Sequence, residues 1–372
     1  MVYNFTVVGD DPNVASLRDW SILDLNHNGK VDVAYDSWVD LNKNNLQDAD
    51  EKPVGDWQLL KDMGCNTIRV YQMPTADARL REIYKNPGDK LTFFHPSNKE
   101  LFRDLYARFG IRVIIGHYLG EWTIGSGAEW QAGTDYRDPV QRKRLLDCIR
   151  VMVEEHKDEP YTLMWMLGNE NFNPYDHDNA EKEVEAFLTL VNEAAKLIHK
   201  LDPDHPVGLC NWQRAHLRDI GRFAPEIDIL GVTAYFGPFG FGTLWGSVKM
   251  DVDRPLLITE YGCSAINKKG QEDEDYQVKY HKRCWEDIVF NKFGNKGVGN
   301  SIGGVVFSWC DQWYLDGYPS RHDITGDPNA LPKGVRGEEW FGITSQGDGS
   351  HSPFLRQLRK TYFLYKNLWR EG

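Results

Sequence analysis

Long apolar runs are missing from this 372-residue chain. No stretch of about 18 consecutive apolar residues occurs, so no membrane-spanning helix is expected. The opening residues MVYNFTVVGD lack the basic and apolar regions of a signal peptide. Positive charge is also scarce, because 43 Lys and Arg face 55 Asp and Glu, for a formal net charge of −12. Such a chain is not expected to bind a nucleic-acid backbone or an anionic membrane, and it is compatible with a neutral substrate.

Several common catalytic and metal-binding motifs are absent as well. The chain has no H-E-x-x-H, P-loop or G-x-G-x-x-G segment. The segment GNSIG at 299–303 is not a nucleophile elbow, because a strand rather than a helix is expected to follow it. None of the six cysteines forms a C-x-x-C pair, which argues against a zinc ribbon, and their scatter favours buried free thiols over disulfides. They are Cys65, Cys148, Cys210, Cys263, Cys284 and Cys310.

Eight short apolar runs predict β-strands. Most are almost continuously apolar, as in parallel strands that are buried on both faces. They lie at 3–8, 66–71, 112–117, 162–168, 206–211, 228–235, 255–260 and 303–309. Helical patterns lie at 54–64, 99–110, 139–156, 180–203 and 354–369. Eight βα units without a break in composition predict one (β/α)8 TIM barrel over residues 1–372, with a doubly wound open sheet as the alternative.

Two predicted connections are too long to be simple turns. Residues 9–55 follow the first strand, and residues 310–351 follow the eighth. Both belong to the C-terminal face of a barrel, where the active sites of this fold are built. We therefore expect these two segments to shape a binding cleft.

The insert at 9–55 contains two segments that resemble calcium-binding loops, DLNHNGKVD at 24–32 and DLNKNNLQDADE at 40–51. Oxygen donors recur at alternate positions, as they do around a hard cation. The predicted ligands are Asp24, Asn26, Asn28, Asp32, Asp40, Asn42, Asn44 and Glu51. Tyr35 stands where the first loop needs a bidentate Glu, so one shared ion is as plausible as two, and a solvated turn is the alternative. We predict structural Ca²⁺ with no part in the chemistry, and no organic cofactor.

Two glutamates end apolar strands at the same end of the predicted barrel. Glu170 follows the apolar run in WMLGNEN at 165–171, and Glu260 follows the apolar run in LLITEYG at 256–262. Two carboxyl groups in one bowl can flank a glycosidic bond, where one protonates the leaving oxygen and the other attacks the anomeric carbon. Asn169 can bond a sugar hydroxyl beside the reacting carbon. A single Glu at a strand end is more often a solvated loop residue, but the pair favours catalysis.

These motifs resemble those of the retaining glycoside hydrolases of clan A. GNE ends strand four and TEYG ends strand seven, and GCNTIRVYQMP at 64–74 is similar to the second strand of family 2 barrel domains. That segment also resembles, more distantly, the family 72 β-1,3-glucanosyltransferases. The segments AAKLIHKLDPDHPV, EEWFGI and FSWCDQWY are similar to family 2 barrels as well.

The resemblance implies a role for several residues. It makes Glu170 the acid/base and Glu260 the nucleophile, with Arg69 holding the nucleophile ionised. It also implies that Tyr235 bonds the nucleophile and that Trp309 forms the floor of the sugar site. His117 is expected to contact a hydroxyl, with a structural histidine as an equally good interpretation.

The loops add two aromatic candidates. Trp122 and Trp313 follow strands three and eight and are expected to stack on sugars, with loop packing as the alternative. The predicted function is a retaining hydrolase of a β-glucan or related oligosaccharide. The alternatives are a transglycosylase, a non-catalytic carbohydrate-binding barrel and a metal-dependent barrel enzyme. The expected partner is an oligosaccharide or polysaccharide, and an extracellular or periplasmic location is favoured.

Overall fold

The structure is a computed structural model of the chain. It describes residues 1–2, 29–30, 32–73, 99–174, 178–267, 269–313, 315, 321–324 and 337–370. The predicted first strand at 3–8 lies outside these residues, as do the calcium-ligand candidates Asp24, Asn26 and Asn28 and the side chain of Asp32.

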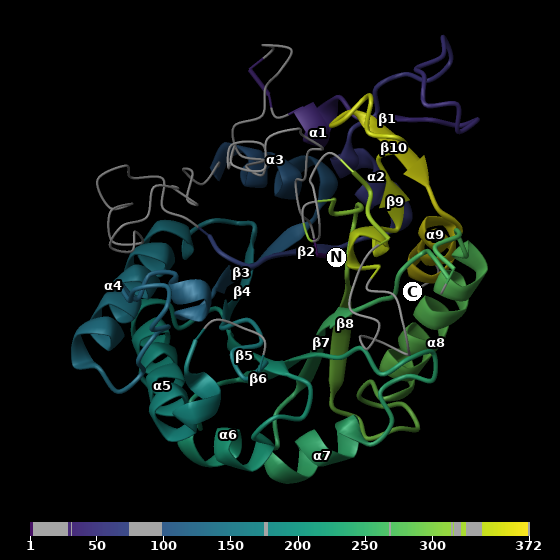
Figure 1. Cartoon of the computed structure of the whole chain (residues 1–372). Helices are drawn as coiled ribbons and strands as arrows, with labels where there is room; N and C mark the ends of the chain where they lie inside the picture. Colours follow the sequence, from purple (N-terminus) through teal and green to yellow (C-terminus); the bar gives the residue numbers. More distant parts are fainter. Residues whose placement is uncertain are drawn as a thin grey trace.

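Seven parallel strands form the central sheet, in the order β2 to β8. They are β2 (Thr67–Val70), β3 (Arg112–His117), β4 (Thr162–Leu167), β5 (Val207–Trp212), β6 (Ile229–Thr233), β7 (Leu256–Tyr261) and β8 (Ser301–Val306). Val2 closes the gap between the two outer strands, since its N–H donates to Val306 and it pairs with Arg69 of β2. The predicted TIM barrel is therefore confirmed, with the chain start in the place of the first strand (Figure 1).

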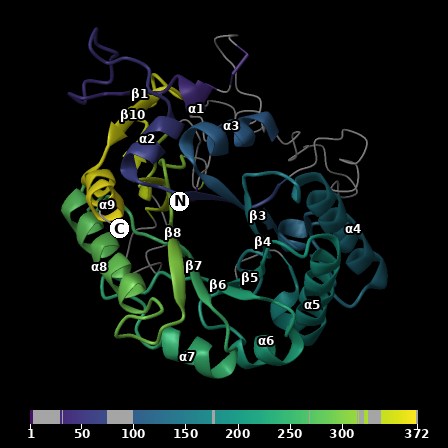
Figure 2. The same ribbon diagram turned by 180° about the vertical axis from the view of Figure 1, so that it is seen from behind.

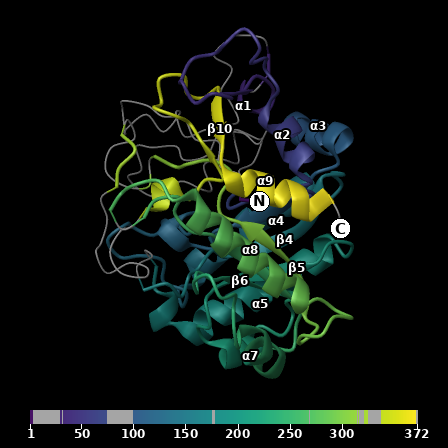
Figure 3. The same ribbon diagram turned by 90° about the vertical axis from the view of Figure 1, so that its right-hand side faces the viewer.

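Helices surround the strands on the outside, as Figure 1 and the reverse view in Figure 2 show. They are α1 (Asp32–Tyr35), α2 (Asp56–Met63), α3 (Lys99–Phe109), α4 (Pro139–His156), α5 (Val184–Leu201), α6 (Leu217–Phe223), α7 (Leu244–Asp251), α8 (Glu274–Phe290) and α9 (Lys360–Arg370). The last helix packs against α8 and α2 and so completes the ring (Figure 3). Within the described residues, no helix is long and apolar enough to cross a membrane.

The strand residues divide between two cores, as alternation along a strand requires. Ile114, Met166, Cys210, Leu257 and Val305 belong to a small cluster inside the barrel. Their neighbours in sequence face the helices and join the large outer core. All six cysteines are free thiols, as the sequence predicts. Side chains two positions after an inner residue of the same strand therefore point into the bowl at the C-terminal end of the barrel.

The predicted helix at 354–369 is wrong in its first half. Residues Leu355–Leu358 form β10, which pairs in parallel with β1 (Trp38–Val39) and antiparallel with β9 (Thr344–Ser345). The buried guanidinium of Arg356 donates to both carboxylate oxygens of Asp56 at 2.9 and 3.0 Å. This small sheet joins residues 38–39 of the insert to the C-terminal part of the chain, and its partners are too distant in sequence for a local pattern to predict.

Candidate active site

Glu260 is held by three donors at the end of β7. Arg69 Nη1 and the hydroxyl of Tyr71 both lie 2.8 Å from its Oε1, and the hydroxyl of Tyr235 lies 2.8 Å from its Oε2. The Glu260 side chain is only 5% exposed. Three donors on a buried carboxylate stabilise its ionised form, which is the form that a nucleophile needs.

Arg69 connects the ends of β7 and β4. Its Nη2 donates to Asn169 Oδ1 at 2.8 Å, while its Nη1 binds Glu260. Burial alone lowers the pKa of the guanidinium, but Cys210 and Glu260 raise it, and the net pKa lies above its ordinary value. The cation therefore stays charged and fixes the nucleophile relative to the amide that precedes Glu170.

Glu170 stands on a tight turn after β4. Its φ is 62°, and Gly168, two residues earlier, has a φ of 69°. A Cβ at Gly168 would lie 2.4 Å from Asn171 Oδ1, so only glycine fits there. Asn173 Nδ2 donates to Glu170 Oε2 at 3.2 Å. This turn presents the carboxylate at the rim of the bowl.

The two glutamates act on the same neighbour. Burial raises the pKa of Tyr235 well above its ordinary value, and the carboxylates of Glu260 and Glu170 raise it further. Tyr235 therefore stays protonated and donates a hydrogen bond to Glu260. Hydrogen bonds join the two strand ends as well, since Arg69 binds both Glu260 and Asn169, the residue before Glu170.

Two residues of the bowl were missed by the sequence analysis. Tyr71 bonds Glu260, and its ring stacks on that of Tyr118 with centroids 6.1 Å apart. Phe307 contacts the inner cluster, and its ring lies edge-on to Tyr235 with centroids 6.3 Å apart. Both follow an inward-facing residue by two positions, so strict alternation along β2 and β8 could have identified them.

Trp309 does not form the floor of the sugar site. Its side chain is fully buried and packs against Tyr362 of α9, with centroids 6.2 Å apart. The strand β8 ends at Val306, so alternation no longer predicts the direction of residue 309. Phe307, two residues earlier, is the aromatic residue after β8 that lies beside Tyr235.

His117 is a buried residue, as the structural interpretation of this histidine expects. It is 0% exposed on the helix-facing side of β3, and its Nδ1 accepts the N–H of Leu119 at 3.0 Å. Burial lowers its pKa to about 3. His156 and His281 are likewise buried and have pKa values lowered to about 3. These three imidazoles are neutral over the range in which most enzymes work.

The two predicted loop tryptophans differ in their surroundings. Trp313 is almost completely buried, and its ring stacks on His322, so loop packing is the correct interpretation for it. Trp122 is 37% exposed, and its ring stacks on Trp130 with centroids 6.0 Å apart. An exposed aromatic pair remains available to a ligand.

The segment 40–51 folds as a compact loop whose oxygen atoms face inward. Asp40 accepts the N–H groups of Asn44 and Asn45, and Glu51 accepts those of Leu41 and Asp48. Asn45 has a φ of 61°, at the sixth position, where calcium loops carry glycine. In the described residues no group of three or more His, Cys, Asp or Glu side chains is arranged to hold a metal, so the amides of Asn42 and Asn44 would have to supply part of the coordination. The donor chemistry of the loop fits Ca²⁺.

The fold and the site together define a class, the parallel barrels that carry two carboxylates at the ends of strands four and seven. Residues 92–314 match the family model described as the TIM barrel domain of glycosyl hydrolases family 2. The match covers more than half of the chain. The chain therefore belongs to this family.

Known relatives agree with this assignment. A β-glucuronidase of Streptococcus agalactiae serotype V is 23% identical over 275 residues, which are 69% of this chain and 40% of that protein. Among solved structures, the β-D-glucuronidase of Dictyoglomus thermophilum (TM-score 0.55, 15% identity) and a β-galacturonidase of Eisenbergiella tayi bound to galacturonate (TM-score 0.53, 20% identity) are similar in fold. Each match covers 85% of this chain and 46% of the other. The chain thus spans less than half the length of these relatives.

Proposed function

We propose that this protein is a retaining β-glycoside hydrolase. The observation that carries the proposal is the buried carboxylate of Glu260, held by Arg69, Tyr71 and Tyr235 at the end of β7. Glu260 attacks the anomeric carbon and forms a glycosyl ester, while the bond to the leaving oxygen breaks and Glu170 gives that oxygen its proton. Glu170 then takes a proton from water, which hydrolyses the ester and frees Glu260.

We further propose a neutral β-linked glucan or related oligosaccharide as the substrate. The acidic balance of the chain, 55 Asp and Glu against 43 Lys and Arg, does not favour a polyanion. Within the bowl, the guanidinium of Arg69 is already engaged by Glu260 and Asn169. The names of the relatives point to a second candidate, a β-uronidase, which would need a cation for the sugar carboxylate.

The test is a panel of aryl β-glucosides, β-galactosides and β-glucuronides, together with β-glucan oligosaccharides. NMR of the first-formed product should show retention of the β-anomer, and we expect the two carboxyl groups to lie about 5–5.5 Å apart. Glu260→Ala should abolish turnover. Glu170→Ala should lose less activity on substrates with activated leaving groups, which need no proton. Inversion of the anomer would contradict the retaining mechanism, and turnover only of β-glucuronides would contradict the neutral substrate. Products longer than the substrate would identify a transglycosylase.

We also propose a structural Ca²⁺ in the loop 40–51. Asp40, Asn42, Asn44 and Glu51 occupy the first, third, fifth and twelfth positions of a calcium loop. The ion would bind to oxygen atoms and stabilise the fold of the insert. Gln357 Nε2 donates to Asp40 Oδ2 at 2.8 Å, so an ordered loop also supports the small sheet that contains β10.

A further inference from the structure

We propose that a polar cavity beside Glu170, together with a pair of exposed tryptophans on one of the loops that build it, binds the leaving-group sugars of a β-linked oligosaccharide. The inference rests on the proposed function and narrows its substrate class. It implies an enzyme that prefers a sugar chain on the leaving side over a small aglycone.

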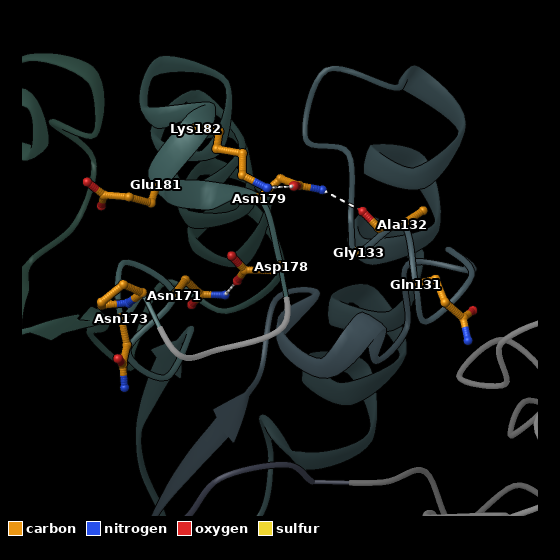
Figure 4. Close-up of a pocket in the computed structure, with 10 residues that line it drawn as sticks. Gln131, Ala132, Gly133, Asn171, Asn173, Asp178, Asn179, Glu181 and Lys182 are labelled. Carbon is orange, nitrogen blue, oxygen red and sulfur yellow. Dashed lines mark hydrogen bonds between the residues drawn. The ribbon is translucent and has the colours of Figure 1, made fainter. Parts of the chain in front are cut away.

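The cavity lies between the loop after β3 and the loop after β4, and has a volume of about 320 Å³. In Figure 4, Gln131 and Gly133 lie on one side of it and Asn173 and Glu181 on the other. Its lining residues are Gln131, Ala132, Gly133, Asn171, Asn173, Pro174, Asp178, Asn179, Glu181 and Lys182. Ligand sites measure roughly 300–1,000 Å³, so the cavity has room for a sugar ring.

The chemistry of the lining suits neutral hydroxyl groups. Side-chain amides offer both donors and acceptors, two carboxylates accept, and a single lysine donates. Sugar hydroxyls can do both as well, whereas a polyanion would be repelled by the carboxylates. The lining therefore favours a sugar over a polyanion.

Asn173 places this cavity on the leaving-group side of the bond that is cleaved. It is one of the lining residues, and its Nδ2 donates to Glu170 Oε2 at 3.2 Å. In the proposed mechanism Glu170 protonates the leaving oxygen, so the group attached to that oxygen must lie beside Glu170. A cavity that shares Asn173 with Glu170 is in the right place to receive that group.

The tryptophan pair stands on the loop that forms one side of the cavity. Trp122 is 37% and Trp130 49% exposed, and their rings are stacked with an interplanar angle of 20°. Trp130 is the residue before Gln131, which lines the cavity. Aromatic planes bury the C–H faces of sugars at a small loss of side-chain entropy. A second sugar beyond the cavity would therefore reach this pair.

Hydrogen bonds fix the tryptophan loop relative to the cavity. Asn179 Nδ2 donates to the carbonyls of Ala132 and Thr134, both at 3.0 Å. Trp122 Nε1 donates to Glu121 Oε1 at 2.9 Å, which sets the plane of one ring. The platform is thus organised before any ligand binds, which lowers the entropy loss of binding.

The experiment compares Trp130→Ala with the unaltered protein on two kinds of substrate. We measure kcat/KM for an aryl β-glycoside and for β-glucan oligosaccharides of two to six sugars. In the unaltered protein, kcat/KM should rise with chain length. In Trp130→Ala, the ratio of the oligosaccharide value to the aryl value should fall about tenfold, mainly through KM, since one lost contact of this kind is worth about one factor of ten. Gln131→Ala should lower the same ratio.

The matched control is Phe293→Ala. Phe293 is 87% exposed after α8, at the opposite end of the barrel, and its removal should leave the ratio unchanged. A chain-length profile that is identical in Trp130→Ala and the unaltered protein would overturn the inference while the aryl activity upheld the proposed function.

A binding assay separates the two ideas further. Oligosaccharides are titrated into Glu260→Gln, which cannot turn over, and tryptophan fluorescence is followed. Fluorescence quenching by an oligosaccharide that the Trp130→Ala substitution abolishes would support the subsite. If the unaltered protein nevertheless cleaved no substrate, the proposed function alone would fail. No quenching by any oligosaccharide would overturn the inference.

Discussion

Arg69→Met is the substitution that tests the proposed nucleophile most directly. Methionine keeps much of the volume of the arginine side chain but removes the cation that contacts Glu260. The carboxylate then keeps only its two tyrosine donors in a site that excludes water. It should take up a proton more readily, and the acid limb of kcat/KM should move to higher pH.

The expected magnitudes follow from the burial of the pair. Arg69 is 1% and Glu260 5% exposed, so water cannot replace the lost contact. Breaking a buried ion pair from one side destabilises a protein by about 3–5 kcal/mol. A hydrogen bond to a charged group contributes about 1.5–3 kcal/mol, which corresponds to a loss of roughly 10- to 150-fold in kcat/KM at the pH optimum.

The assay is a pH profile of kcat/KM with an aryl glycoside, together with urea unfolding. Arg356→Met is the matched control, because Arg356 also forms a buried pair, with Asp56, but lies far from Glu260 in the small sheet. Both variants should lose several kcal/mol of stability, and only Arg69→Met should shift the acid limb. An unshifted acid limb in Arg69→Met would mean that the guanidinium positions Glu260 without controlling its charge.

Three further predictions use the same structure. Trp309→Ala should lower the free energy of unfolding by about 3–5 kcal/mol, as expected for a core tryptophan, whereas Phe307→Ala should mainly lower kcat/KM; the reverse pattern in urea unfolding and kinetics would restore Trp309 to the sugar site. A chelator should lower the melting temperature by removing a ligand that binds only the folded state, and Asp40→Ala should no longer respond to it; equal melting with and without chelator would remove the Ca²⁺ proposal. A histidine whose folded pKa is about 3 and unfolded pKa about 6.5 stabilises the fold fully above pH 6.5 and loses that contribution as the pH falls toward 3. His281→Asn should therefore reduce the slope of the unfolding free energy against pH in this window by about one proton, or 1.4 kcal/mol per pH unit. An unchanged slope in urea unfolding at several pH values would contradict the burial of His281.

The barrel was predictable because its signals are local and repeated. The runs at 112–117 and 139–156 coincide with β3 and α4, since continuous apolar strands and a Pro-initiated helix are specified by neighbouring residues. The pairing of β1 with β10 was not predictable, because it joins residues about 300 positions apart and each strand is short. The turn at Gly168 and Glu170 depends on backbone angles that sequence alternation does not report.

The candidate site shows the same division between strands and loops. Glu260 and Arg69 lie within β7 and β2, where the geometry of the barrel decides that they meet, and Glu170 and Tyr235 follow β4 and β6 by three and two residues. The direction of a side chain beyond the strand end depends instead on how each loop packs, and Trp309 and Trp313 turned into the core for that reason.

Loops also decide what a barrel of this family recognises. The carboxylate that would attack the sugar is held by residues of β2 or just after β2 and β6, whereas the cavity beside Glu170 is built by the loops after β3 and β4. In the proposed mechanism the first set would perform the same chemistry on any β-linked sugar, because it surrounds the carboxylate that meets the anomeric centre. The second set is where an oligosaccharide can be distinguished from a small glycoside, since Trp130 directly precedes Gln131 of the cavity lining and both stacked tryptophans are exposed. Changing the loop that carries Trp130 should therefore alter chain-length preference without altering the stereochemistry of the product, and a change in product anomer would show that this loop takes part in the reaction itself.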